Sequence, residues 1–576
     1  MPWKAPLADM QFVLQHWLRA ELAWQAMPPY ADIDLDLATQ VLEEAARFSE
    51  QVLAPLNAPG DRQGCRLDDG DVRTPEGFAA AYRAYVEGGW PALACAPELG
   101  GQGLPQVLDA ALQEMLFASN HAWAMYTGIA HGAYLCLKTH ASDELQARYL
   151  PGIVSGETLP TMCLTEPQAG SDLGLLRCRA EPMGDGRYAV TGNKLFISGG
   201  DHDLTHDIVH LVLARLTDAP AGSRGLSLLL VPKWLDDGQR NAVYCDGLEH
   251  KLGIRGSATC ALRFEGASGW LVGQAHGGLA AMFVMMNSAR LHVGLQGLAH
   301  AQAAWQYASA YAWERRQMNA PGQAKGAAYP IHLHPAMRRI LLELRVRTEG
   351  MRALGYWAAH WLDIADASAD LAQRAKASKL AALLTPIIKA VFTDLGFNLA
   401  SKALQVFGGY GYTCEFAIEQ TLRDSRIAMI YEGTNEVQAN DLLLRKVLGD
   451  GGEGFALLLV ELRQETGAGE EGDALRRVCD TLEMVLAKVQ LSAANDPEYP
   501  YRAAGDFLQL CGTALQAYAW ARTCRCIQAL PVDAPQRLEK QESARYFFDY
   551  LLPDFDRQVA AIDAAAAPLP FIHQPF

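Results

Sequence analysis

The stretch Ile430-Tyr431-Glu432-Gly433-Thr434-Asn435-Glu436 places one carboxylate between an aromatic residue and a glycine. Asn435 is a suitable N-cap for a following helix, and Gln438, three residues later, completes a capping box. This helix is expected to end at Gly449, because glycine readily adopts the left-handed conformation that often follows a helix. The pattern therefore puts Glu432 on a short loop in front of a helix, a good position for a general base. A carboxylate in this position can also serve only as a partner for the helix dipole.

The composition indicates a large folded protein. The chain has 576 residues, half of them hydrophobic, which predicts three or four domains. A net charge of -16 makes nucleic acid an improbable ligand, because phosphate binding needs clustered Lys and Arg. The 12 cysteines are scattered without a C-x-x-C pair, as in proteins whose thiols stay reduced. The N-terminus does not resemble a secretory signal, and no apolar run reaches the roughly 18 to 20 residues of a membrane span. We therefore expect a cytoplasmic protein.

The order of sequence patterns predicts a mainly α protein with a β domain in the middle. Short β-prone segments separated by glycine-bearing turns lie between helical regions, and Met183–Arg187 has the composition of a hairpin turn. These segments predict a small antiparallel domain of the sandwich or barrel type. The predicted domains are an N-terminal extension (1–36), a helical domain (37–158), a middle β domain (159–278), a helical-bundle domain (279–449) and an additional helical domain (450–576).

Two motifs in the predicted β domain suggest a cofactor site. The first, Thr165–Asp172, supplies hydroxyl groups and a glycine that permits close approach of a ligand to the backbone. The second contains Phe196 and Ser198, which share one face of an extended strand. A ring beside a hydroxyl suits a flat heteroaromatic cofactor, since one stacks and the other donates a hydrogen bond. Each motif alone is also compatible with an ordinary turn between a strand and a loop.

The spacing of His202, His206 and His210 matches a metal site on a helix. The surrounding sequence Ile208–Leu213 is instead typical of a strand, which does not hold these three side chains on one face. We therefore predict no metal site here.

Six motifs occur in a fixed order along the chain, and together they are far more specific than any one of them. They are T-E-P-x-A-G-S-D, K-x-F-I-S-G-G, A-x-E-R-R-Q, Q-V-F-G-G-Y-G-Y, R-D-S-R-I and I-Y-E-G-T-N-E-V-Q. The chain resembles the FAD-dependent acyl-CoA dehydrogenase family over about residues 37 to 448. The extra C-terminal length, the opening Trp3–Pro6 and the segment Glu249–Ile254 resemble the larger bacterial branch that contains 3-methylmercaptopropionyl-CoA dehydrogenases.

The resemblance implies an N-terminal helical domain, a middle β domain and a helical bundle that bind FAD among them. Phe196 stands where the family usually has Trp, and Ser198 where it often has Thr. Arg315 matches an arginine that reaches the cofactor of a neighbouring subunit. The implied substrate-binding residues are Ser171, Arg290 and Gly433. The implied cofactor-binding residues are Leu164, Thr165, Gly170, Ser171, Phe196, Ser198, Arg315, Gln405, Gly408, Gly409, Thr434 and Glu436.

The resemblance also implies the reaction, a step of fatty acid β-oxidation. Glu432 matches the catalytic base that removes the α-proton of an acyl-CoA thioester, while the β-hydrogen leaves as hydride to the flavin, giving a trans-2-enoyl-CoA. A minority of the family places its base directly before the residue matched by Arg290, and Ala289 in that position favours Glu432. The implied electron acceptor is an electron-transfer flavoprotein.

Two alternatives are an acyl-CoA oxidase that uses oxygen and a non-catalytic scaffold relative. The C-terminal helical domain is expected to complete a homodimer, and docking on a membrane surface is the alternative role for it.

Overall fold

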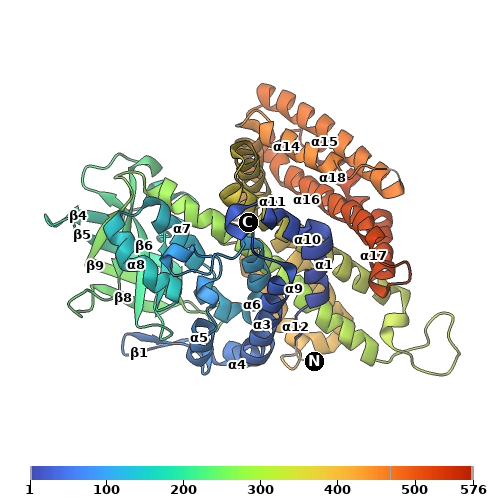
Figure 1. The fold of residues 1–576 in the computed structure, drawn as a ribbon, viewed down its shortest axis with the longest axis horizontal. Helices are drawn as coiled ribbons and strands as arrows, with labels where there is room; N and C mark the ends of the chain where they lie inside the picture. Colours follow the sequence, from blue (N-terminus) through green and yellow to red (C-terminus); the bar gives the residue numbers. More distant parts are fainter. Residues whose placement is uncertain (1–2, 468, 572–576) are drawn as a thin grey trace. The chain divides into compact units, whose positions relative to one another are not determined.

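The computed structural model describes residues 3–467 and 469–571 and divides by its contacts into two units. One unit contains Leu42–His292, joined by the segment before Pro6. The other contains the described residues of Pro6–Val41 and Val293–Phe576. Figure 1 labels helices and strands of both units along the ribbon. Their helices and strands confirm the predicted fold, mainly α with a β domain in the middle.

The first unit combines a helical part with a β-sheet part. Apolar residues at three-to-four spacing form its helices, and α6 is buried along almost its whole length. The helices are α3 (Leu35–Phe48, which begins in the other unit), α4 (Ala54–Gln63), α5 (Phe78–Glu87), α6 (Gln106–Thr127), α7 (Ala130–His140) and α8 (Asp143–Ser155). The strands are β1 (Arg66–Asp68), β2 (Asp71–Arg73), β3 (Thr158–Cys163), β4 (Arg179–Pro182), β5 (Tyr188–Ser198), β6 (Asp207–Leu216), β7 (Leu226–Pro232), β8 (Val243–Leu248) and β9 (Thr259–Val272).

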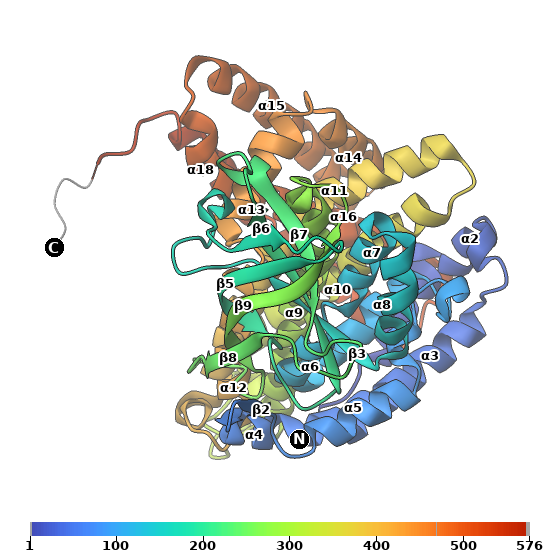
Figure 2. The same ribbon diagram turned by 90° about the vertical axis from the view of Figure 1, so that its left-hand side faces the viewer.

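The strand pairings close a barrel. β6 pairs with β7, β7 with β9, β9 with β5, β5 with β4, and β4 again with β6, while β3 and β8 extend this ring (Figure 2). Most of these pairs are antiparallel, as predicted, and the turn between Pro182 and Tyr188 is the expected hairpin. The pairs β3–β6 and β4–β6 are parallel, which the sequence pattern did not indicate. β7 is buried along its full length because it lies between two strands and beneath packed side chains.

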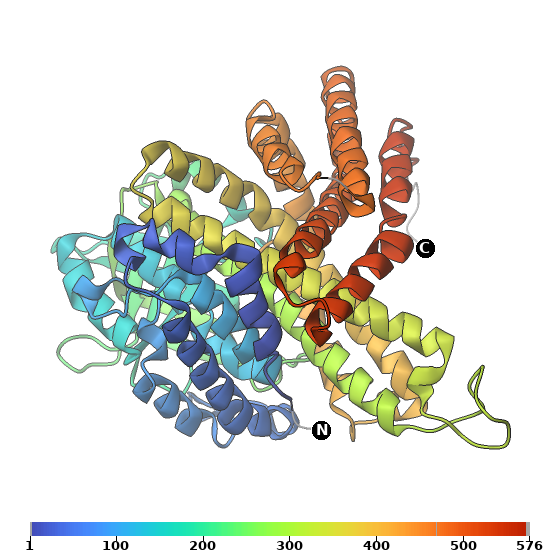
Figure 3. The ribbon, with the colours of Figure 1, turned by 45° about the vertical axis from the view of Figure 1, so that its right-hand side comes forward.

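The second unit is helical. Its helices are α1 (Leu7–Phe12), α2 (Ala20–Gln25), the later part of α9 (Gly278–Glu314), α10 (Pro335–Ala367), α11 (Leu371–Phe407), α12 (Ala417–Ser425), α13 (Asn435–Asn440), α14 (Glu453–Arg463), α15 (Glu470–Asn495), α16 (Tyr499–Cys526), α17 (Pro535–Tyr546) and α18 (Asp554–Ala564). Figure 3 shows the orange and red helices of the C-terminal region grouped together. The segment Leu371–Tyr412 is apolar and long enough to cross a membrane, but 72% of its most apolar window is buried, as in the core helix of a globular domain.

The N-terminal segment packs into this helical unit rather than standing apart from it. The Asp9 carboxylate forms ion pairs with Arg352 on α10 and Lys540 on α17. The Trp17 indole donates a hydrogen bond to the carbonyl of Ala519, 3.3 Å away on α16. The first helices of the chain are therefore held by its last helices.

Candidate active site

A buried ion pair joins the two motifs of the β-barrel unit. The Lys194 ammonium lies 2.9 Å from Glu166 Oε1, and it also donates to the carbonyls of Leu164 at 2.9 Å and Leu213 at 2.8 Å. Lys194 is 0% exposed and Glu166 is 4% exposed. All three donors of the ammonium are used, so this buried charge is fully satisfied. The pair fixes the loop after β3 against β5.

Glu166 is held as a carboxylate. Burial by itself raises the pKa of Glu166, but the Lys194 charge and the backbone N–H groups of Arg177 and Cys178 outweigh it, and the pKa lies below its ordinary value. Those N–H groups donate at 2.7 and 2.9 Å. The Leu195 N–H also donates to the Thr165 carbonyl at 2.9 Å. Leu164 and Thr165 thus lie immediately beside the strand that leads to Phe196.

Phe196 occupies a strained position. Its φ is 59°, a left-handed value that costs a residue with a side chain about 1–2 kcal/mol. The pairing of β5 with β9 shifts register between Lys194 and Ile197, so a bulge interrupts the simple alternation that we predicted to put Phe196 and Ser198 on one face. The Phe196 side chain is 61% exposed, whereas Ser198 is half-buried. A strained backbone that presents a large ring to the surface is typical of a ligand site.

The loop after β3 exposes backbone and hydroxyl groups. Gly170 is exposed, and a Cβ added there would meet no atom within 4 Å, so the loop leaves open space. Ser171 is also exposed, and Asp172 Oδ1 fixes the following turn by accepting from the Gly174 N–H at 2.9 Å. The exposed ring on β5, and the open backbone and hydroxyl of this loop, are the kinds of group that a heteroaromatic, phosphate-bearing cofactor needs.

Glu432 lies on a loop of the helical unit with an unusual backbone. Glu432 and Gly433 both have left-handed φ values, 57° and 87°. Only glycine adopts this conformation freely, so Glu432 is strained. A Cβ on Gly433 would lie 2.8 Å from Gln438 Nε2, so a side chain there would have to displace the Gln438 amide.

Two buried side chains hold the carbonyl groups of this loop. Gln438 Nε2 donates to the carbonyl of Glu432 at 3.0 Å, and Lys389 Nζ donates to the carbonyl of Gly433 at 2.7 Å. Lys389 also donates to Asn435 Oδ1 at 2.9 Å. The Tyr431 hydroxyl donates to Gln296 Oε1 on α9, and burial raises the pKa of this phenol. These contacts compensate for the backbone strain and fix where the Glu432 side chain starts.

The helix after the loop begins differently from the prediction. Thr434, not Asn435, is the N-cap of α13, and its hydroxyl accepts from the Val437 N–H at 3.4 Å. The Asn435 side chain is instead engaged by α11, and Gln438 caps nothing because its amide binds Glu432. The helical segment continues as a π-helix over Asp441–Leu448 and ends at Gly449, as predicted. Gly449 itself has a right-handed φ of -71°, and the left-handed glycines are Gly451 and Gly452.

Other predicted site residues gather at the end of α11. Arg315 follows α9, and its guanidinium carbon lies 5.6 Å from the centre of the Tyr410 ring. Gln405 is in the last turn of α11, and Gly408 and Gly409 follow in a tight turn where an added Cβ would meet nothing within 4 Å. Gln405, Gly408 and Gly409 are exposed. This turn offers open backbone to a ligand.

Arg290 and Glu436 complete the predicted set. Arg290 on α9 is 8% exposed and lies 5.9 Å from the Phe283 ring centre. Glu436 is in the first turn of α13, where its own backbone N–H and then the Thr434 hydroxyl lower its pKa. Arg290 belongs to the barrel unit with the 164–198 residues, and Glu436 to the helical unit with Glu432.

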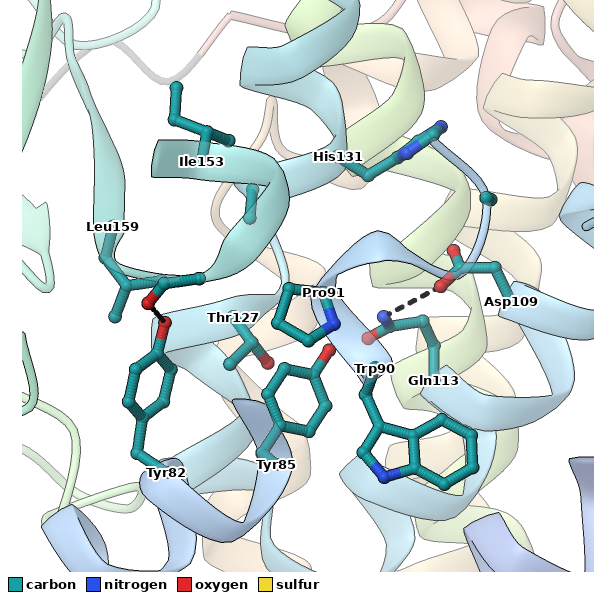
Figure 4. Close-up of a pocket in the computed structure, with 13 residues that line it drawn as sticks. Tyr82, Tyr85, Trp90, Pro91, Asp109, Gln113, Thr127, His131, Ile153 and Leu159 are labelled. Carbon is teal, nitrogen blue, oxygen red and sulfur yellow. Dashed lines mark hydrogen bonds between the residues drawn. The ribbon is translucent and has the colours of Figure 1, made fainter. Parts of the chain in front are cut away.

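A small cavity in the barrel unit is too small for an acyl group. It is lined by Tyr85, Asp109, Gln113 and His131, among others (Figure 4). Its volume of about 20 Å³ leaves room for roughly one or two water molecules. Gln113 Nε2 donates to Asp109 Oδ1 at 3.2 Å, and burial lowers the pKa of His131 to about 4. This cavity therefore has room for water but not for an acyl group.

The three histidines considered for a metal do not assemble. His210 is on β6, where its Nδ1 lies 2.7 Å from the Thr161 hydroxyl, and burial lowers its pKa to about 3. His206 stacks on Trp234, and His202 packs edge-on against Tyr126. Within residues 3–467 and 469–571, no three His, Cys, Asp or Glu side chains are placed to hold a metal.

Sequence reasoning missed the residues that support the site. Glu166 and Lys194 stand inside the two quoted motifs, and a charged pair within β-prone sequence was a usable signal. Lys389 carried no such signal, because it lies in the long apolar stretch of α11.

Family models match four consecutive parts of the chain. They are the acyl-CoA dehydrogenase N-terminal domain at 36–157, the middle domain at 161–267, the C-terminal domain at 276–446 and an acetyl-CoA dehydrogenase C-terminal-like domain at 456–570. The fold and the matched domains define a flavin-dependent acyl-CoA oxidoreductase. The chain belongs to the acyl-CoA dehydrogenase family, and FAD is its cofactor.

Relatives and solved structures agree with this assignment. The 3-methylmercaptopropionyl-CoA dehydrogenase of Ruegeria pomeroyi is 42% identical, over 89% of each chain. The broad-specificity linear acyl-CoA dehydrogenase FadE5 of Mycobacterium tuberculosis is 35% identical, over 84% of this chain and 81% of the relative. Caenorhabditis elegans ACDH-11 in complex with C11-CoA superposes with a TM-score of 0.75 at 21% identity, over 96% of this chain and 92% of that one. Acyl-CoA dehydrogenase complexed with FAD from Bacillus anthracis gives 0.74 at 20% identity, over 93% and 88%.

Proposed function

We propose that this enzyme removes hydrogen from the α and β carbons of an acyl-CoA thioester, with Glu432 as the base. The observation that carries the proposal is the left-handed backbone of Glu432, which Lys389 and Gln438 hold in place through the adjoining carbonyls. Strain of this kind persists where the surrounding structure over-determines it, most often at functional sites.

The proposed chemistry of the chain is proton abstraction from a weak carbon acid. Glu432 takes the α-proton, and its backbone N–H donates to the thioester oxygen, where negative charge develops. Exclusion of water strengthens that hydrogen bond. FAD, when bound, supplies the acceptor for the β-hydride. The product is a trans-2-enoyl-CoA.

The remaining site residues have proposed binding roles. Arg290, Gly433 and Ser171 would contact the substrate. Arg315 would reach the cofactor of a neighbouring subunit in a homodimer. The proposed contacts to FAD within the chain are Leu164, Thr165, Gly170, Ser171, Phe196, Ser198, Gln405, Gly408, Gly409, Thr434 and Glu436.

Anaerobic bleaching of the flavin tests the reaction and the substrate together. Straight, branched and sulfur-containing acyl-CoAs are added to the oxidised enzyme, and the rate of bleaching ranks them. The sulfur-containing 3-methylmercaptopropionyl-CoA belongs in the panel because the relative from Ruegeria pomeroyi is named for it. Absence of bleaching by every acyl-CoA would contradict the proposal.

The base is tested by Glu432→Gln. We expect this variant to keep its FAD absorbance and to lose at least roughly 10²-fold in bleaching rate, as for removal of a general base. Glu415→Gln, an exposed carboxylate of the same unit, is the matched control. Bleaching of Glu432→Gln at the wild-type rate would show that Glu432 is not the base.

The proposed acceptor is an electron-transfer flavoprotein, and the proposed setting is a cytoplasmic homodimer. Rapid reoxidation of the bleached enzyme by that flavoprotein, with slow peroxide release in air, supports this role. Fast peroxide release without it would indicate an oxidase. Sedimentation of the purified protein tests the homodimer, and sedimentation with lipid vesicles tests docking on a membrane.

A further inference from the structure

A chain of hydrogen bonds connects the extra C-terminal domain to the loop that carries Glu432. Gln509 on α16 donates through Nε2 to Asp394 Oδ2 at 2.7 Å. Asp394 Oδ1 accepts from Asn435 Nδ2, also at 2.7 Å. Asn435 Oδ1 accepts from Lys389, whose ammonium donates in turn to the carbonyl of Gly433. All of these residues belong to the helical unit.

The helices that carry this chain are in close contact. α16 contacts α10, α11 and α13, and Figure 1 shows α11 and α16 side by side. A Cβ on Gly512 would lie 2.6 Å from Val391 Cγ2 on α11, and one on Gly350 would lie 2.2 Å from Gln516 Oε1. The small residues let the helices approach closely, so a side chain on α16 has a fixed distance from α11.

Asp394 depends on its two amide partners. Burial raises the pKa of Asp394 above its ordinary value, and the hydrogen bonds from Asn435 and Gln509 oppose that rise. Loss of one amide leaves a half-buried carboxylate with weaker support. Asp394 is the closest of three acceptors of Asn435 Nδ2, which also donates to the Thr393 hydroxyl at 3.1 Å and to the Ala390 carbonyl at 3.2 Å. A shift of the Asp394 carboxylate is therefore expected to move the Asn435 amide and the Lys389 contact that Asn435 shares.

We propose that Gln509 and Asp394 are positioning residues for the catalytic base, so that the additional C-terminal domain supports the active-site loop directly. The inference rests on the proposed role of Glu432. Neither residue is proposed to touch substrate or cofactor. They act through Asn435 and Lys389 on the backbone at Gly433, next to Glu432.

Gln509→Ala in the full-length enzyme is the first test. The limiting rate of flavin bleaching at saturating acyl-CoA is expected to fall about tenfold, because small displacements of a catalytic group are costly. The acyl-CoA concentration for half-maximal rate and the FAD content should stay within twofold. Gln516→Ala removes the same amide two turns later on α16, where it faces α10, and should leave the limiting rate unchanged.

A swapped pair separates positioning from loss of fold. Gln509→Glu places two carboxylates together and should slow bleaching, as should Asp394→Asn. The double variant Asp394→Asn/Gln509→Glu restores one donor and one acceptor and should recover most of the rate. Full rate in Gln509→Ala and Gln509→Glu, with FAD bound, would overturn the proposal, as would failure of the swap to recover any rate.

A Glu432→Gln background distinguishes this inference from the proposed function. If Glu432→Gln bleaches at the wild-type rate, the base assignment itself fails. If Glu432→Gln is slow and the Gln509 variants are not, only the positioning role fails. We expect Gln509→Ala to cause less than a twofold further loss in the Glu432→Gln enzyme, since a base that is absent cannot be misplaced.

Discussion

The Lys194 ammonium and the Glu166 carboxylate meet at 2.9 Å inside the β-barrel unit, with side-chain exposures of 0% and 3%. Each residue comes from a different sequence motif, and Lys194 precedes Phe196 on β5 by two residues. The ion pair therefore sets the position of the loop at Leu164 and Thr165 relative to the strained aromatic residue. Removal of either charge leaves the other one buried without its partner.

Lys194→Met is expected to destabilise the barrel unit by about 3–5 kcal/mol, because it leaves the buried Glu166 carboxylate without its counter-charge. Denaturant unfolding followed by tryptophan fluorescence measures the change. Arg179→Met, which breaks an exposed pair with Glu181, should cost less than about 1 kcal/mol. Equal effects of the two substitutions would contradict the role of the buried pair.

The contribution of Glu166 should disappear in acid. Its pKa in the folded protein is below its ordinary value, so the stabilisation is complete above the unfolded pKa of about 4.3 and is lost as pH falls through the folded value. The difference in unfolding free energy between wild type and Glu166→Gln should therefore be largest near neutral pH and shrink below about pH 4. A difference that stays constant between pH 7 and pH 3 would refute this linkage.

Phe196→Gly should separate stability from cofactor binding. Glycine relieves the left-handed strain, so the unfolding free energy of the apoprotein should be unchanged or higher by up to about 1 kcal/mol. The affinity for FAD should fall roughly threefold to tenfold through loss of an aromatic contact. Phe196→Trp is the control that keeps an aromatic ring. Fluorescence titration with FAD measures the affinity of both variants, and denaturant unfolding measures their stability. Tighter FAD binding by the glycine variant would exclude a stacking role.

Gly433→Ala should displace the base. The new Cβ would stand 2.8 Å from Gln438 Nε2 at a φ of 87°, so the hydrogen bond that holds the Glu432 carbonyl must break or move. We expect the limiting bleaching rate to fall by roughly tenfold or more. Gly451→Ala imposes a similar left-handed strain in open space and should preserve that rate, so a matching loss there would point to general destabilisation.

The fold was predictable because periodicity and order survive in local sequence. Short β-prone segments between helical regions predicted the β domain, and Ile208–Leu213, expected to be a strand, lies within β6. The parallel pairing of β3 with β6 was not predictable, because β4 and β5 lie between them in the sequence and neither segment contains a pattern that specifies its partner strand.

The site residues that belong to a sequence motif were predictable, whereas the residues that contact them from distant parts of the chain were not. Glu432, Phe196 and the glycines stand in the motifs themselves. Asn435 was expected to cap α13, since its side chain has the right chemistry, but Asp394 and Lys389 engage it from α11 and leave the cap to Thr434. These partners are more than forty residues away, where no local pattern reports them.

The ion pair between Asp9 and Lys540 has a consequence for biosynthesis. The two residues are 531 positions apart, so the first helix leaves the ribosome long before its partner is translated. The barrel unit, nearly continuous from Leu42 to His292, has its own partners early and can mature while translation continues. The helical unit, which bears Glu432, can complete its packing only after Lys540 has been translated. A nascent chain that stops before Lys540 lacks the ion pair of that residue with Asp9, and we expect its helical unit to be open to quality-control proteases.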